Sequence, residues 1–126
     1  MIIGIGIDIV AIRRIKTADE RWGRRFLERV FTEDEIRYCF DHKFPYTHLA
    51  GRFASKEAAM KAFGTGLSRG IRWKDAEVVR NSDGKPEIVL HGKLRELADT
   101  KLVKKIHISI THDGGNAIAQ VILEGE

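Results

Sequence analysis

RFASKEAAMKAFGTG, residues 52–66, is the stretch that decides the fold. It predicts one helix that carries a carboxylate, Glu57, among several cations and then stops at a glycine turn. The helix is expected to span residues 46–63, with Gly64 and Gly66 marking its end. Such a segment can hold a metal ion and phosphate groups in one place.

Strands are expected through most of the remaining chain. Each candidate segment is either continuously apolar and rich in β-branched residues, or alternates apolar and polar residues. A turn rich in Asn, Ser, Asp and Gly separates the two middle segments, which predicts a hairpin. The expected strands are residues 2–10, 75–80, 87–90, 106–110 and 117–123.

Further helices are expected in three places. Residues 11–30 carry an apolar stripe with arginines lying off it, which predicts helix in one piece or two. Thr32 and Glu35 have the spacing of a capping box, so a helix should start there and run to about His42. A short helix is expected over residues 92–100.

The order of these elements predicts the fold class. A strand comes first, helices follow, and the rest is mostly strand with one helix. We therefore expect an α+β fold in which an antiparallel sheet packs against the long central helix. No repeat or linker is evident, so residues 1–126 should form a single domain.

Basic residues crowd the segment that follows the first strand. The chain has 126 residues, with 22 Lys and Arg against 18 Asp and Glu and a formal charge of +4. Much of the excess lies in residues 13–29. This cluster favours an acidic partner, namely nucleic acid, a phosphorylated cofactor or an acidic protein.

The cellular compartment is indicated by the single cysteine. Cys39 cannot form an intrachain disulfide, which suits a reducing cytosol. No apolar run approaches the ~20 residues of a membrane span, and the N-terminus does not resemble a signal peptide. We therefore expect a cytoplasmic protein with no membrane partner.

Asp8 and Glu57 are the candidate metal ligands. Asp8 lies near the end of an apolar strand, where a carboxylate is costly unless it is paired or binds a metal. Two carboxylates beside a cluster of Lys and Arg suit divalent-metal chemistry on a phosphorylated substrate. Two simpler roles remain open at this point. Asp8 can cap the following helix, and Glu57 and Lys61 can form an ordinary surface pair four residues apart.

The other candidate positions also have structural alternatives. Gly64 and Gly66 can end a helix or let a phosphate approach the backbone. His112 can be structural or can contact a ligand. Gly4 and Gly6 lack the dinucleotide-binding fingerprint and are interpreted as packing residues. No Ser-His-Asp triad or zinc-binding pattern is present.

Taken together, four blocks of the chain resemble the holo-acyl-carrier-protein synthase family, the small 4′-phosphopantetheinyl transferases. They span nearly the whole chain in the family's order, and the third resembles the family's signature helix almost throughout. The blocks are residues 6–10 with Arg14 and Ile15, residues 31–35 with Tyr38 and Cys39, residues 52–66, and residues 109–112 with 117–119.

The resemblance implies transfer of 4′-phosphopantetheine from coenzyme A to a serine of apo-acyl carrier protein. The other product is adenosine 3′,5′-bisphosphate, and the reaction serves fatty acid biosynthesis. Asp8 and Glu57 would hold Mg²⁺ on the coenzyme A pyrophosphate, and Lys61 would neutralise charge on the phosphate or the leaving group. Glu57, directly or through a metal-bound water, would take the serine proton.

The resemblance also implies binding surfaces and an assembly. The family is typically a homotrimer with active sites between subunits. An arginine-rich helix would dock the acidic carrier protein and make association salt-sensitive; its residues here are Arg14, Arg21, Arg24 and Arg25. The candidates for coenzyme A contacts are Arg52, Lys56, Gly64, Thr65, Gly66, Asn81, Pro86 and His112.

Three departures from the family pattern are visible. Ala11 stands where many members have an acidic residue, Thr111 stands where many have serine, and residues 113–116 form a glycine-rich version of the loop. Two other functions stay open on the sequence alone. One is a non-enzymatic nucleic-acid-binding module built on the arginine-rich helix, and the other is a structural oligomer whose carboxylates only form ion pairs.

Overall fold

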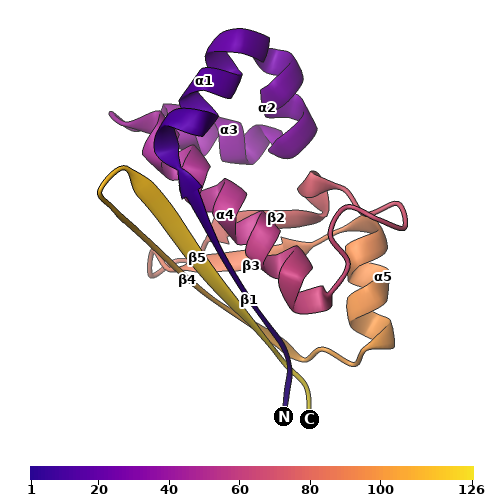
Figure 1. Cartoon of the computed structure of the whole chain (residues 1–126). Coiled ribbons are helices and arrows are strands. Elements are labelled where there is room, and N and C mark those ends of the chain that lie inside the picture. Colours follow the sequence, from indigo (N-terminus) through magenta and orange to yellow (C-terminus); the bar gives the residue numbers. More distant parts are fainter.

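The computed structural model describes all residues from 1 to 126 and has the expected α+β architecture (Figure 1). The predicted helices and strands are all present, with boundaries close to those expected. They are β1 (Ile2–Ala11), α1 (Ile12–Trp22), α2 (Arg24–Val30), α3 (Glu33–Phe40), α4 (Pro45–Phe63), the short 3₁₀ helix η1 (Trp73–Asp75), β2 (Ala76–Arg80), β3 (Pro86–Leu90), α5 (Gly92–Thr100), β4 (Lys105–Asp113) and β5 (Asn116–Glu124).

The strands form two antiparallel sheets. The larger sheet has the order β1-β5-β4, so β1 and β4 are its two edges. The β2–β3 hairpin pairs only with itself, a division that the sequence pattern does not reveal. Helix α4 lies across the inner face of the larger sheet, while α1, α2 and α3 gather at one end of it (Figure 1).

The close approach of β1 to α4 depends on two glycines. A Cβ atom on Gly6 would lie 1.9 Å from the carbonyl oxygen of Ala58, and one on Gly4 would lie 2.1 Å from that of Ala62. Neither distance is sterically allowed, so the strand can lie against the helix backbone only with glycine at both positions. Their interpretation as packing residues is confirmed.

The core forms around α4. Small and apolar side chains occupy most of that helix, so the sheet, α1 and α3 can approach it closely. Buried members from the helix itself include Leu49, Ala54, Ala58, Met60 and Phe63. Gly64 ends the helix in the left-handed conformation, with φ of 77°, as the glycine turn predicted.

A buried ion pair joins α4 to its neighbours. The side chains of Lys56 and Glu35 are both 0% exposed, and their charged atoms lie 2.8 Å apart. The Lys56 ammonium also donates to the Ala76 carbonyl at 2.8 Å, while Glu35 accepts from the Val78 amide at 2.9 Å. Removing one partner of such a pair leaves a buried charge unpaired, at a cost of about 3–5 kcal/mol.

The helices at the end of the molecule begin and end at recognisable signals. Gly23, with φ of 57°, separates α1 from α2, so the predicted helical stretch forms two pieces. The capping box is confirmed, because Thr32 accepts from the Glu35 amide and Glu35 accepts from the Thr32 amide. No helix is both long and apolar enough to cross a bilayer.

The outer face of β1 carries a row of exposed isoleucines. Ile3, Ile5, Ile7 and Ile9 are between 37% and 59% exposed. Because side chains alternate along a strand, the same alternation that places Gly4 and Gly6 against α4 turns these isoleucines outward. A contiguous apolar row of this kind is typical of a surface that contacts another molecule.

We predict that Gly6→Ala destabilises the fold by about 3 kcal/mol or more, because the new methyl group would force β1 away from α4. Equilibrium unfolding in urea measures the change. Gly66→Ala is the matched control, since nothing lies within 4 Å of its added Cβ and only its positive φ of 60° opposes alanine, at about 1–2 kcal/mol. Equal losses in the two variants would contradict the close approach.

Candidate active site

Asp8, Glu57 and Lys61 are brought together where β1 crosses α4. The Lys61 ammonium donates to the Ile7 carbonyl at 3.0 Å and to the Asp8 carboxylate at 3.1 Å. Lys61 is 54% exposed and Asp8 is 16% exposed, so the lysine lies over a carboxylate that is largely covered. This contact joins strand to helix and leaves the ammonium accessible to an anion arriving from solvent.

The two carboxylates are close enough to affect each other. The pKa of Glu57 is raised, first because burial disfavours the charged carboxylate and second because Asp8 repels it; Lys61 and Arg14 oppose the shift. Two partly buried carboxylates that repel each other form a site that favours a cation between them. Arg14 is near enough to influence Glu57, so the basic surface of α1 adjoins this pair.

The donor set fits Mg²⁺ bound together with a phosphorylated ligand. Mg²⁺ in proteins usually takes one or two carboxylates and fills its remaining positions with water and phosphate oxygens. Asp8 and Glu57 supply such a pair, and no cluster of three or more His, Cys, Asp or Glu side chains forms a closed metal cage anywhere in the chain. The oxygen donors match a hard cation, whereas a structural zinc site would need Cys or His.

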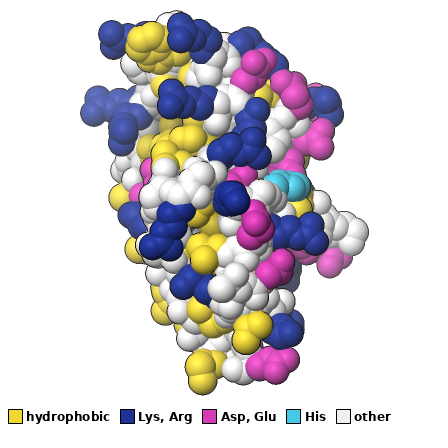
Figure 2. Space-filling model, turned by 90° about the vertical axis from the view of Figure 1, so that its right-hand side faces the viewer, with side chains coloured by type: hydrophobic (Ala, Val, Ile, Leu, Met, Phe, Trp, Pro, Cys, Tyr) yellow, Lys and Arg dark blue, Asp and Glu magenta, His cyan; other side chains and the backbone are white.

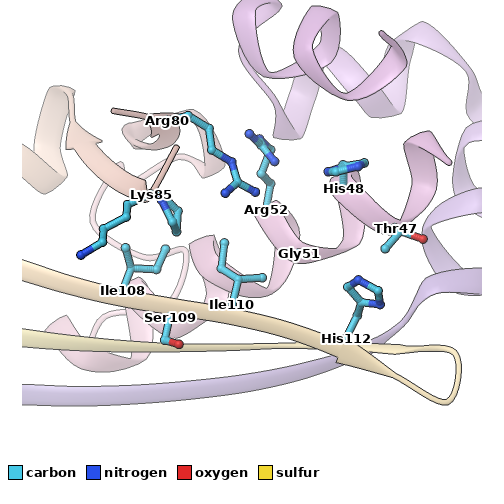
Figure 3. Close-up of a pocket in the computed structure, with 11 residues that line it drawn as sticks. Thr47, His48, Gly51, Arg52, Arg80, Lys85, Ile108, Ser109, Ile110 and His112 are labelled. Atoms are coloured by element: carbon cyan, nitrogen blue, oxygen red, sulfur yellow. The ribbon is translucent and has the colours of Figure 1, made fainter. Parts of the chain in front are cut away.

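A second, positively charged site lies around Arg52. It is a cavity of about 520 Å³ between α4, the β2–β3 hairpin and β4, and no acidic residue lines it. Figure 3 shows Arg52 and Arg80 reaching toward each other, and His112 on β4 pointing toward His48 on α4. The polar or charged side chains that line it are Thr47, His48, Arg52, Arg80, Lys85, Ser109 and His112.

Two features of Arg52 suit a residue that binds an anion. It is only 2% exposed, and its Nε atom has no hydrogen-bond partner. A buried donor without a partner is costly unless a ligand satisfies it. Because the guanidinium of arginine matches the geometry of phosphate, a phosphate group is the ligand that this cavity fits best.

The pKa of His48 is affected by the positive charges around the cavity. Its pKa is lowered, first by burial and then by the positive charges of His42, Arg52, Arg80 and His112. Each of these causes disfavours a further positive charge in an empty cavity. An anion in the cavity would remove part of the penalty, so anion binding and histidine protonation are coupled here.

Three of the predicted coenzyme A contacts, Arg52, Pro86 and His112, line this cavity. The turn of Gly64, Thr65 and Gly66 lies at the other end of α4, with open space next to both glycines. Thus the structure brings part of the predicted set together and leaves the glycine turn elsewhere.

Two of the predicted contacts have their polar groups engaged within the protein. Lys56 is fully buried, and its ammonium is bonded to Glu35 and the Ala76 carbonyl, which leaves it no path to a phosphate in solvent. Burial lowers the Lys56 pKa, and the charge of Glu35 opposes that shift. Asn81 holds the hairpin turn by accepting from the amides of Asp83 and Lys85. We therefore assign structural roles to Lys56 and Asn81.

The cavity also contains basic residues that the sequence did not single out. His48 precedes Arg52 by four residues, so the two share a face of α4. Arg80 ends β2 and Lys85 lies in the hairpin turn, a region from which the sequence indicated only Asn81 and Pro86. The spacing of His48 was readable in the sequence, but the meeting of hairpin, helix and strand was not.

The two sites lie on different sides of α4. Arg52 and Glu57 are five residues apart, which corresponds to a rotation of about 140° around a helix. Asp8, Glu57 and Lys61 do not line the Arg52 cavity. Within one chain, the carboxylate pair and the Arg52 cavity therefore face in different directions.

The predicted docking residues all lie exposed on α1 and α2. Figure 2 shows Lys and Arg side chains gathered around hydrophobic ones at the end of the molecule where these helices lie. Arg24 is partly neutralised by Glu28 and Glu33. A groove between the cations is lined by Trp22, Arg25, Phe26 and Arg29. The surface thus combines positive charge with exposed aromatic area.

Known proteins resemble the chain over nearly its full length. A family model described as the 4′-phosphopantetheinyl transferase superfamily matches residues 4–121. A holo-[acyl-carrier-protein] synthase of Koribacter versatilis is 47% identical over 124 residues, which cover 98% of this chain and 99% of the relative.

Solved structures agree with this result. The holo-[acyl-carrier-protein] synthase of Neisseria meningitidis superposes with a TM-score of 0.90 at 31% identity, covering 98% of this chain and 99% of that one. The corresponding protein of Helicobacter pylori, in complex with coenzyme A, gives 0.84 at 36% identity, with 95% and 99% coverage.

We predict that His48 makes the protein less stable as the pH falls below its ordinary pKa of 6.5. Because its folded-state pKa is lowered, the unfolded chain binds more protons in this range, and unfolding is favoured. The free energy of unfolding in urea should therefore drop less between pH 7.5 and 5.5 in His48→Gln than in the wild type. Identical drops would contradict the positive field assigned to the cavity.

Proposed function

The chain belongs to the 4′-phosphopantetheinyl transferase superfamily, and we propose that it is a holo-acyl-carrier-protein synthase. It moves 4′-phosphopantetheine from coenzyme A to a serine of apo-acyl carrier protein and releases adenosine 3′,5′-bisphosphate. The observation that carries this proposal is the full-length 47% identity to a protein of that name. The alternative of a nucleic-acid-binding module gains no support from the comparisons.

The reaction is a displacement at phosphorus. The serine oxygen forms a bond to the phosphorus that carries the pantetheine, and the bond from that phosphorus to the bridging oxygen of the pyrophosphate breaks. Little covalent work is required of the protein, so positioning and charge neutralisation dominate. Lys61 is placed to neutralise the phosphate under attack or the departing group. Glu57, directly or through a bound water, accepts the serine proton.

Asp8 and Glu57 would hold Mg²⁺ in this proposal. The ion, when bound, supplies positive charge to the pyrophosphate oxygens. The proposal is supported by the oxygen-only donor pair, by the mutual repulsion of the two carboxylates and by the lysine above them. Asp8 reaches this position because the glycines of β1 allow the strand to lie against α4.

The Arg52 cavity would anchor the nucleotide half of coenzyme A. Coenzyme A carries a phosphate monoester on its ribose in addition to the pyrophosphate, and the cavity provides Arg52, Arg80, Lys85 and His112 for it. Pro86 offers an apolar surface beside these cations for the adenine ring. The Gly64–Gly66 turn, open to solvent, lets phosphate oxygens approach the backbone on the other side.

Because the two sites of one chain face different ways, we place one coenzyme A between two chains. β1 and β4 are opposite edges of the sheet, so contact between β1 of one copy and β4 of the next is head-to-tail and can close into a ring. The exposed isoleucines of β1 provide apolar surface for that contact. We propose that the ring is a homotrimer.

The arginine-rich surface of α1 and α2 would receive the carrier protein. Arg14, Arg21 and Arg25 are exposed, and the influence of Arg14 on the pKa of Glu57 supports a position of this surface beside the proposed reacting groups. Positive charge would steer an acidic carrier to the site. The Michaelis constant for carrier protein should then rise with salt more than that for coenzyme A; equal rises would argue against this surface.

With Cys39 as the only thiol, buried and unpaired, we propose a cytoplasmic location.

We predict that Glu57→Gln lowers the turnover number by about a thousandfold while leaving the fold intact. The amide keeps the shape of the side chain but loses the charge that binds the cation. Chromatography of released adenosine 3′,5′-bisphosphate measures the rate, with and without a chelator. The matched control is Glu96→Gln on the exposed face of α5, which should behave as the wild type. Full activity of Glu57→Gln, or of chelated wild type, would reject the metal role.

The shared site predicts complementation between two inactive variants. Arg52→Gln damages the cavity and Glu57→Gln damages the carboxylate pair, so each variant alone should be nearly inactive. Co-expressed, they should form mixed assemblies in which some sites contain both intact halves, and activity should reappear. Native mass spectrometry confirms mixing and oligomer size. Mixed assemblies as inactive as their parents would place the whole site in one chain.

A further inference from the structure

The ring of Tyr38, on α3, is surrounded by basic side chains, three of which line the Arg52 cavity. The Arg52 guanidinium lies 4.2 Å from the ring centroid, and that of Arg80 lies 5.8 Å away. The rings of His42 and His48 lie 4.5 Å and 5.9 Å from it, centroid to centroid. Tyr38 itself does not line the cavity.

These contacts offset the repulsion between the two arginines of the cavity. Two guanidinium groups face each other there, no carboxylate lines the cavity, and the Nε atom of Arg52 has no hydrogen-bond partner. Like charges without a counterion tend to separate. An aromatic face attracts cations without supplying a negative charge that would compete with an incoming anion. The Tyr38 ring can therefore keep both arginines in place and leave their donors free.

Arg80 has one further internal contact. Its Nη1 atom donates to the Gly84 carbonyl at 2.7 Å, so the hairpin turn and the Tyr38 ring hold the guanidinium together. Arg52 approaches the same ring from α4. The ring thereby links the helix and the hairpin, the two elements that carry the cations of the cavity.

We propose that Tyr38 is a positioning residue for phosphate recognition. It holds Arg52 and Arg80 ready for the phosphate monoester on the ribose of the nucleotide, and so sets the preference for a nucleotide that carries this group over one that lacks it. The inference rests on the proposed function, which supplies the nucleotide. Ready-placed donors strengthen binding because less side-chain freedom is lost when the ligand arrives.

The test measures nucleotide binding by calorimetry on the intact assembly without carrier protein. Adenosine 3′,5′-bisphosphate is compared with adenosine 5′-monophosphate, which lacks the 3′-phosphate. Wild type and Tyr38→Phe should prefer the bisphosphate by about tenfold or more, since the ring is kept. Tyr38→Leu should lose most of this preference through weaker bisphosphate binding, with monophosphate binding unchanged. A purely structural tyrosine would affect both nucleotides equally, and that result overturns the proposal.

Two further variants make the test specific. Tyr46→Leu alters the other half-buried tyrosine, which bonds to Asp19 outside the cavity, and should keep the wild-type preference. Arg80→Gln should also weaken bisphosphate binding, and the loss in the double variant should be smaller than the sum of the two single losses, because Tyr38 acts in part through Arg80. Additive losses would overturn the proposal.

The outcome does not depend on transfer activity. Should Tyr38→Leu fail to fold, Tyr38→Met takes its place with the same expectations. A wild-type protein that binds both nucleotides equally would overturn the proposal even if it transfers phosphopantetheine. Loss of discrimination in Tyr38→Leu would support it even if the natural acceptor proved to be another protein.

Discussion

The contact between β1 and the backbone of α4 is the constraint on which the rest of the structure depends. Gly4 and Gly6 allow it, because any side chain there would collide with helix carbonyls. The same contact places Asp8 beside Lys61 and Glu57. Strand alternation then turns the isoleucines of β1 outward, to the surface through which we propose the chains assemble. Packing, the carboxylate pair and the proposed assembly surface thus follow from one close approach.

Charge is divided between the two sides of α4. One side presents two carboxylates under a lysine, which suits a metal ion shared with a pyrophosphate. The other presents Arg52 and its cationic neighbours, which suit a phosphate monoester. Between them the helix is held by the buried pair of Lys56 and Glu35, so its rotation about its own axis is fixed. In our proposal, a ligand with phosphates at both ends of its nucleotide uses both sides where two chains meet.

Much of the fold could be predicted from the sequence because its signals are local. The capping box at Thr32, the glycine at position 64 and the alternation of β4 each depend on neighbouring residues alone. Contacts between distant segments could not be predicted. The family resemblance made Lys56 a candidate for phosphate contact, but its side chain is buried against Glu35, which lies 21 residues away in the sequence. The Arg52 cavity likewise needs helix, hairpin and strand together, so His48, Arg80 and Lys85 were missed.

The most direct test of the central claim is the intact mass of an apo-acyl carrier protein after incubation with this chain, coenzyme A and Mg²⁺. The account predicts a gain equal to one phosphopantetheine group on the carrier's serine, and no gain when the chain carries Asp8→Ala. An unchanged mass with several acidic carriers, from protein shown to be folded, would contradict it. In that case the carboxylate pair and the Arg52 cavity would have to serve a different phosphorylated ligand.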